Sequence, residues 1–67
     1  MKQFKTYEDA CQYAEDESEN TFDVKFYVFI SLGKWTVSDE PEKDDIENSV
    51  TVFMNGVELE WTFLHRT

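Results

Sequence analysis

The sequence predicts an α+β fold, in which an N-terminal helix packs on one face of a four-stranded antiparallel sheet. Apolar residues recur with a helical period before residue 20, and they alternate with a period of two from residue 22 onward. Two glycine-containing turns each separate a pair of alternating segments, as β-hairpins require. The expected order is therefore α-β-β-β-β, in a single domain that covers residues 1–67.

The first expected element is a helix that begins after Thr6. The Thr6 hydroxyl can accept a hydrogen bond from the first helical turn, and Glu8 and Asp9 follow where the helix dipole favours negative charge. The helix is expected to end between Glu17 and Asn20, with Asn20 as its C-terminal cap. Its apolar stripe consists of Tyr7, Ala10, Cys11 and Ala14, and its opposite side carries Glu8, Glu15 and Glu19, flanked by Asp9 and Asp16.

The segment 22–32 is expected to form the first and longest strand. Its even-numbered residues are apolar and would face the helix, whereas Tyr27 and Phe29 would lie on the outer face of the sheet. Gly33-Lys34 follows as a two-residue turn with glycine first, which is typical of type II′. This turn predicts the apolar pairs Leu32–Trp35 and Ile30–Val37.

The second hairpin is expected around Asn55-Gly56, the preferred dipeptide of a type I′ turn. Each inward-facing pair that this turn predicts is apolar, namely Met54–Val57, Val52–Leu59 and Val50–Trp61. The outward side holds the polar residues Thr51, Glu58, Glu60 and Thr62, together with Phe53.

Between the two hairpins, residues 38–48 combine Pro41 with clustered charge, which is typical of a loop. Ile46 is the residue of this loop that is expected to turn inward. Two strand orders fit the pattern. The strands can follow each other as a meander, or the long first strand can lie in the centre of the sheet.

Charge is the property in which the chain departs most from an ordinary small domain. Fifteen acidic and six basic residues give a net charge of −9, beyond the roughly 2–8 charges usual for a small soluble domain. Such a charge attracts cationic partners and opposes direct binding to nucleic acid or to anionic membranes. The N-terminus does not resemble a signal peptide, and the longest apolar stretch is too short to span a bilayer. We therefore expect a cytoplasmic protein, in the host cytoplasm if it is phage-encoded.

No residue is expected to be catalytic. His65 is the only histidine and lies two residues from the C-terminus, where a fixed catalytic geometry is difficult to hold. Cys11 belongs to the apolar stripe and excludes, as the single cysteine, an internal disulfide and a zinc–thiolate cluster. The acidic segment 39–47 lacks the spacing and the glycine of an EF-hand loop. We expect no enzyme activity, no metal site and no cofactor.

The negative charge is concentrated in two blocks. Residues 1–20 carry six acids and two lysines, a net charge of −4, and residues 39–48 carry six acids and one lysine, a net charge of −5. These blocks are either solvated surface or an imitation of nucleic-acid phosphates, since the helical acids recur at rises of about 6–10 Å. The candidate partner-binding residues are Glu8, Asp9, Glu15, Asp16, Glu19, Asp39, Glu40, Glu42, Asp44, Asp45 and Glu47, together with Tyr27, Phe29 and Phe53.

In size, charge and compactness the chain is similar to the small acidic proteins with which bacteriophages block host nucleases, polymerases and defence complexes. This likeness implies an inhibitor, such as an anti-CRISPR or anti-restriction DNA mimic. It would act, as a monomer or homodimer, on a basic protein surface that normally binds nucleic acid. The alternative is an antitoxin, immunity or assembly protein that binds, without mimicry, through an exposed outer sheet face of Tyr27, Phe29, Phe53 and Leu64. A metal-binding regulator that uses residues 39–47 is a second alternative.

Overall fold

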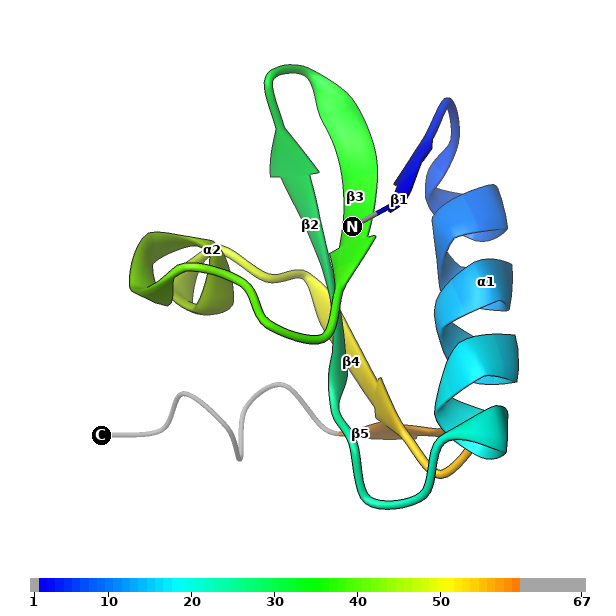
Figure 1. Cartoon of the computed structure of the whole chain (residues 1–67). Coiled ribbons are helices and arrows are strands. Elements are labelled where there is room, and N and C mark those ends of the chain that lie inside the picture. Colours follow the sequence, from blue (N-terminus) through cyan, green and yellow to red (C-terminus); the bar gives the residue numbers. More distant parts are fainter. Residues whose placement is uncertain (1, 60–67) are drawn as a thin grey trace.

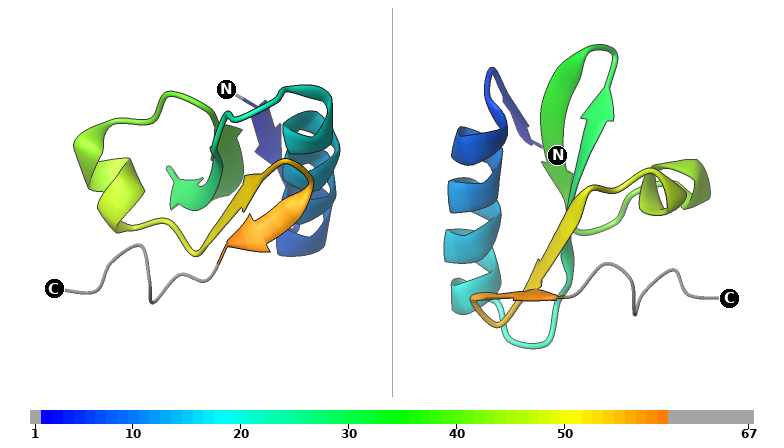
Figure 2. Two further views of the ribbon diagram at one scale, coloured as in Figure 1. Left: turned by 90° about the horizontal axis from the view of Figure 1, so that it is seen from below. Right: turned by 180° about the vertical axis from the view of Figure 1, so that it is seen from behind.

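A computed structural model describes residues 2–59 and shows a helix packed against an antiparallel sheet (Figure 1). The strands lie in the order β1-β3-β2-β4-β5, so the α+β class is confirmed with one strand more than predicted. Helix α1 covers one face of the sheet, and the short helix α2 lies on the other side (Figures 1 and 2). The elements are β1 (Lys2–Phe4), α1 (Tyr7–Asn20), β2 (Phe26–Ser31), β3 (Lys34–Ser38), α2 (Lys43–Glu47), β4 (Thr51–Met54) and β5 (Val57–Leu59).

Helix α1 begins as the sequence predicts. Thr6 is its N-cap, and the Asp9 backbone N–H donates to the Thr6 hydroxyl at 3.2 Å. Ala10 and Ala14 are completely buried against the sheet, because their small side chains let the helix approach closely. The helix ends at Asn20, within the predicted range of Glu17 to Asn20, but the predicted cap is wrong by one residue, because the C-cap is Thr21 in an extended conformation.

Strand β1 is the strand that the sequence pattern does not predict. Three residues are too few to show alternation, and the strand exists because it pairs with the edge of β3, with Phe4 opposite Trp35. The Phe4 ring also packs on α1, where its centroid lies 5.2 Å from that of Tyr13. The N-terminal segment is therefore tied to both layers of the fold.

Strand β2 occupies the centre of the sheet, between β3 and β4, which confirms the second of the two predicted strand orders. It begins at Phe26 instead of residue 22, and Phe22 is 81% exposed. A turn precedes the strand. It is closed by Asn55, whose side-chain oxygen accepts from the Asp23 backbone N–H at 2.8 Å.

The first hairpin turns one residue earlier than predicted. Its two-residue turn is Leu32-Gly33, with φ values of 53° and 76°, so the turn is type I′ and not type II′. Ile30 pairs with Trp35 instead of Val37, a shift of two residues along β3. Such a shift keeps every side chain on its face, so alternation alone could not exclude it. Leu32 is left 96% exposed at the tip.

We expect Leu32→Asn to stabilise the fold by about 1 kcal/mol, because a left-handed backbone costs most L-residues about that amount and asparagine is preferred in this turn. In a domain of this size the melting temperature should rise by about 4–8 °C. Leu32→Ala is the matched control, since it removes the exposed side chain but keeps the unfavourable backbone. Equal gains from both variants, measured by thermal and urea unfolding, would contradict a backbone origin.

The second hairpin has the predicted turn but the opposite orientation. Asn55 and Gly56 have φ values of 57° and 77°, and Val52 pairs with Leu59, as expected. However, β4 pairs with β2 in a register that places Phe53 on the α1 side, where it is 5% exposed. The prediction that Phe53 lies on the outer face is therefore wrong. The predicted Val50–Trp61 pair involves a residue outside the described range.

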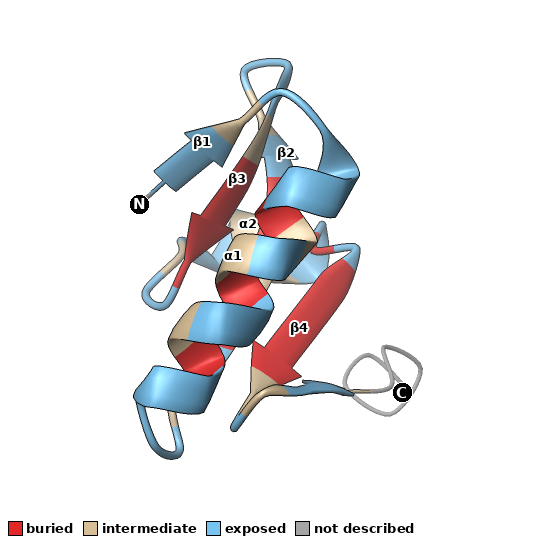
Figure 3. Ribbon diagram, turned by 90° about the vertical axis from the view of Figure 1, so that its right-hand side faces the viewer, coloured by how far each residue is buried: buried red, intermediate tan, exposed pale blue. Residues whose placement is uncertain are grey.

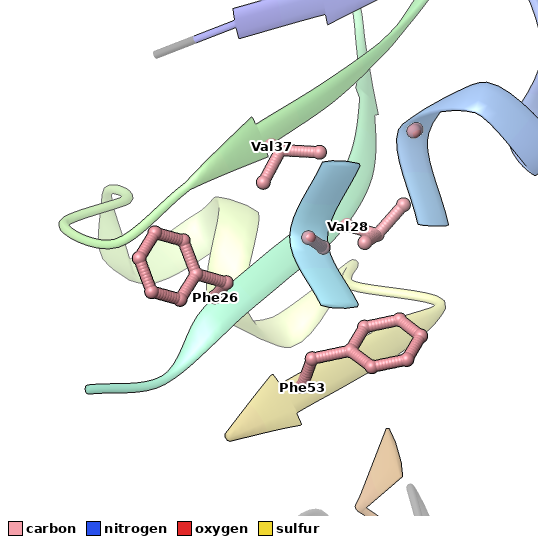
Figure 4. Packing of buried hydrophobic residues seen from close by; sticks show 6 residues of the cluster. Phe26, Val28, Val37 and Phe53 are labelled. Carbon is pink, nitrogen blue, oxygen red and sulfur yellow. The ribbon is translucent and has the colours of Figure 1, made fainter. Parts of the chain in front are cut away.

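Both faces of the central strands are buried. On the α1 side, Phe26 and Val28 of β2 gather with Val37 and Phe53 against the two helical alanines (Figure 4). On the other side Phe29, Val52 and Thr36 are fully buried. The expected exposed aromatic face does not exist: Phe29 is 0% exposed and Tyr27 is half-buried. The predicted fourth member of that face, Leu64, lies outside the described residues.

Helix α2 occupies Lys43–Glu47 of the segment 38–48 that was predicted as a loop, whereas residues 39–42 form a loop as predicted. Asp44 and Asp45 lie in its first turn, where the helix dipole favours negative charge. The helix contacts β2, and Ile46 is half-buried, in agreement with the inward orientation predicted for it. Neither helix of residues 2–59 is long and apolar enough to cross a membrane.

Candidate functional site

The first acidic block lies on the outer face of α1. Ala10, Ala14 and Ser18 form the buried stripe of this helix, half-buried residues flank the stripe, and the opposite side of the helix is exposed (Figure 3). From Glu8 to Glu15 the helix rises by about 10 Å, and from Glu15 to Glu19 by about 6 Å. The five predicted partner-binding acids of this block are all exposed: Glu8, Asp9, Glu15, Asp16 and Glu19.

Most of these carboxylates have no partner among the described residues. In residues 2–59, the side-chain carboxylates that accept a hydrogen bond belong to Asp16, Glu17 and Asp23. The Asp16 and Glu17 bonds come from residues one helical turn earlier, Gln12 and Tyr13. The remaining acids of α1 therefore keep their acceptor capacity for a partner.

The second acidic block lies on the other side of the sheet from the first. It consists of the loop after β3 and of α2, and Figures 1 and 2 show this segment and α1 on opposite sides of β2 and β4. The two blocks therefore do not form one continuous surface. Asp45 is half-buried, and the other predicted residues of the block are exposed: Asp39, Glu40, Glu42, Asp44 and Glu47.

An open groove of about 400 Å³ runs beside α1, along the second hairpin. One wall comes from α1 and the other from β4, β5 and their turn. Glu58 reaches this groove because it pairs with Phe53, and cross-strand partners project from the same face of a sheet. The lining residues are Tyr7, Glu8, Cys11, Gln12, Glu15, Phe53, Gly56 and Glu58.

Glu58 is a site residue that the sequence reasoning missed. The Phe53–Glu58 pair follows from the Asn55-Gly56 turn, so the pairing itself is predictable. What was assigned wrongly is the face of the hairpin. The signal available in the sequence was Phe53, an aromatic residue that should favour the buried side over the exposed one.

Two of the groups that line the groove, the Cys11 thiol and the Tyr7 hydroxyl, have raised pKa values. Burial raises the pKa of the Cys11 thiol, and the nearby Glu58 and Glu15 carboxylates raise it further. Burial likewise raises the pKa of Tyr7, whose hydroxyl shares a hydrogen bond with Thr51. A neutral, partly buried thiol is a poor nucleophile.

Two of the lysines lie close together at one end of the sheet. Lys5 and Lys34 line a second hollow of about 440 Å³, between the end of β1 and the tip of the first hairpin. Lys2 lies on β1, opposite Val37 of β3. Lys25 precedes β2 and Lys43 belongs to α2, so the lysines of the described residues are spread over several elements.

The predicted aromatic binding residues are not brought together. Phe53 projects toward α1, whereas Tyr27 and Phe29 belong to other positions of the sheet, with Phe29 fully buried. Among residues 2–59 no three acidic, cysteine or histidine side chains converge on a position that could hold a metal ion. His65 lies outside the described residues. No protein-family model, curated protein or solved structure matches the chain.

Proposed function

We propose that the protein is an inhibitor that occupies a basic, nucleic-acid-binding channel of another protein. The observation that supports this is the exposed negative charge on both sides of a thin sheet domain. Its principal extents are 30 × 26 × 18 Å, and ten of the eleven candidate acids are exposed. The carboxylates would take the place of phosphates and pair with arginine and lysine side chains.

A channel fits this arrangement better than a flat surface does. A flat basic patch can contact the acids of α1 or those of α2, but not both, because the sheet separates them. A channel lined by basic residues on both walls can contact both blocks. Channels of this kind hold nucleic acid in CRISPR effectors, so defence nucleases are the first class of target. Restriction enzymes and RNA polymerase are the next classes of target.

Many weak contacts would supply the affinity. An exposed ion pair contributes only about 0.2–1 kcal/mol, so several must form together. Long-range attraction between a domain of net charge −9 and a basic channel would also speed association. Both effects weaken as salt is added.

The burial of the aromatic residues counts against the alternative function. An antitoxin, immunity or assembly protein that binds through the outer sheet face would need Phe29 and Phe53 at the surface, and they are 0% and 5% exposed. The acidic surfaces remain as the candidate interface.

The proposal is tested by displacement of a fluorescent 30-bp DNA duplex from purified Cas9-type effector, restriction enzyme and RNA polymerase. We expect the protein to displace the duplex from at least one of these targets. Its affinity for that target should decrease as the salt concentration increases. Two variants are compared, in which each glutamate of one acidic block becomes glutamine and each aspartate becomes asparagine. The first variant changes Glu8, Asp9, Glu15, Asp16 and Glu19. The second changes Asp39, Glu40, Glu42, Asp44 and Glu47. Both variants should lose displacement. Loss in only one would contradict the two-walled channel, and displacement by both would contradict the acidic interface.

A further inference from the structure

The turn of the second hairpin contains a residue pair that is prone to a spontaneous covalent change. Asn55 is the one asparagine of the sequence that is followed by a glycine. In such a pair the backbone nitrogen of the glycine can attack the side-chain carbonyl carbon of the asparagine, because no glycine Cβ hinders the approach. Asn55 is exposed, so water can reach its side chain. The turn therefore combines a reactive pair with access to solvent.

The reaction, deamidation, has two steps. In the first, the Gly56 nitrogen gives up its proton and forms a bond to Cγ of Asn55, while the Cγ–Nδ2 bond breaks. The amide nitrogen leaves as ammonia, which carries that proton, and a five-membered succinimide ring remains. In the second step, water adds to either carbonyl of the ring and opens it, which leaves an aspartate or an isoaspartate at position 55. The first step requires that the Gly56 nitrogen and Cγ of Asn55 can approach each other.

In the folded protein both reacting groups are held by hydrogen bonds. The Gly56 N–H donates to the hydroxyl of Ser18 at 3.0 Å, and Ser18 is completely buried. The side-chain oxygen of Asn55 accepts from the Asp23 backbone N–H at 2.8 Å, and its amide group donates to the Asp23 carboxylate at 3.3 Å. The nucleophile is therefore bound to α1, and the electrophile is bound to the segment before β2.

Release of the Gly56 nitrogen requires the turn to move away from α1. The two are in close contact, since a Cβ at Gly56 would lie 3.2 Å from the Cβ of Glu19 (Figure 1). The Ser18 hydroxyl is itself fixed, because it donates to the Glu15 carbonyl at 2.9 Å. Local opening of a folded protein has a free-energy cost of its own, up to that of global unfolding. The rate of reaction should therefore follow the population of the open turn.

We propose that Asn55 is a deamidation site that the fold protects, and that the hydrogen bond from Gly56 to Ser18 is the protecting contact. A chain that opens at this turn is modified irreversibly. The product also opposes closure of the turn. The new carboxylate at position 55 cannot donate a hydrogen bond to Asp23, and it repels the Asp23 carboxylate. The site thus marks chains that have been open and weakens their return to the closed form.

The first test follows deamidation of the full-length chain by mass spectrometry with peptide mapping, at mildly alkaline pH. Ser18→Ala removes the acceptor of the Gly56 N–H. Val37→Ala is the control, because Val37 is 2% exposed in β3, so that its truncation destabilises the fold at a position outside the turn. Urea unfolding curves give the fraction of unfolded chain in each variant, and the wild type unfolded in urea gives the unprotected rate.

We expect Asn55 of the folded wild type to deamidate at least about tenfold more slowly than in the unfolded chain. Ser18→Ala should raise the folded rate by about two- to tenfold more than its unfolded fraction explains, because the loss of one hydrogen bond favours opening by about that factor. For Val37→Ala the unfolded fraction should explain the whole increase. Equal rates in the folded and unfolded wild type would overturn the protection. A Ser18→Ala rate that the unfolded fraction fully explains would overturn the role of Ser18.

The second test examines the effect of the product on the fold. Asn55→Asp mimics the aspartate product, and we expect its melting temperature to be several degrees below that of the wild type. Asp23→Asn in the same chain supplies an amide donor opposite the new carboxylate and should recover most of the loss. Asparagine tolerates the φ of 60° at position 23. An unchanged melting temperature for Asn55→Asp, or no recovery in the double variant, would contradict the proposed opposition to closure.

Discussion

Phe29→Ala is expected to leave the protein unfolded, or nearly so, under conditions in which the wild type is folded. Phe29 is 0% exposed in the central strand of the sheet. Truncation of a buried phenylalanine to alanine costs about 3–5 kcal/mol, and a domain of this length is stable by only about 3–10 kcal/mol. The measurement is urea unfolding followed by far-ultraviolet circular dichroism.

Phe22→Ala is the matched control, because Phe22 is 81% exposed and the substitution removes the same atoms. We expect it to change the free energy of unfolding by less than about 0.5 kcal/mol, as is usual at the surface. A Phe29→Ala variant that unfolds at the wild-type urea concentration but no longer binds its partner would contradict the buried position. It would also restore the outer sheet face as a binding surface.

Gly56→Ala is expected to destabilise the protein more than Gly33→Ala does. Both glycines have positive φ, 77° and 76°, so both substitutions incur the left-handed backbone cost of about 1–2 kcal/mol. At Gly33 a new Cβ would meet nothing within 4 Å, whereas at Gly56 it would lie 3.2 Å from the Cβ of Glu19. The crowding at Gly56 should add about 1 kcal/mol or more.

The difference between the two glycine variants measures how tightly the second hairpin packs on α1. The Gly56 backbone N–H donates to the buried Ser18 hydroxyl at 3.0 Å, and this hydroxyl donates in turn to the Glu15 carbonyl. A shift of the turn would strain both hydrogen bonds. Equal destabilisation by Gly33→Ala and Gly56→Ala in urea titrations would contradict this expectation. It would mean that the C-terminal end of α1 moves to accommodate the new Cβ with no loss of folding free energy.

The candidate site is partly predictable from the sequence. The exposure of Glu8, Glu15 and Glu19 follows from the helical period alone, because the buried alanines set the opposite side. The separation of the two acidic blocks does not follow from it. The side of the sheet on which residues 39–47 lie depends on the path of the connection from β3 to β4. The local sequence pattern does not specify that path.

Interactions between near neighbours in the chain account for the parts of the fold that could be predicted. These are α1 with its Thr6 cap, the type I′ turn at Asn55-Gly56 and the pairing on either side of that turn. Each depends on residues within a few positions, where dihedral preferences and hydrogen-bonding partners decide the outcome.

Which face of each strand is covered depends on long-range packing and could not be predicted from local patterns. Alternation identifies a buried face when the other face is solvated, but the central strand β2 is buried on both sides, with Val28 and Phe29 each 0% exposed. The face of β4 was then set by its pairing with β2, which brought Phe53 to the core and Glu58 to the groove. The long-range pairing of strands, and not the local pattern, therefore placed Glu58 beside α1.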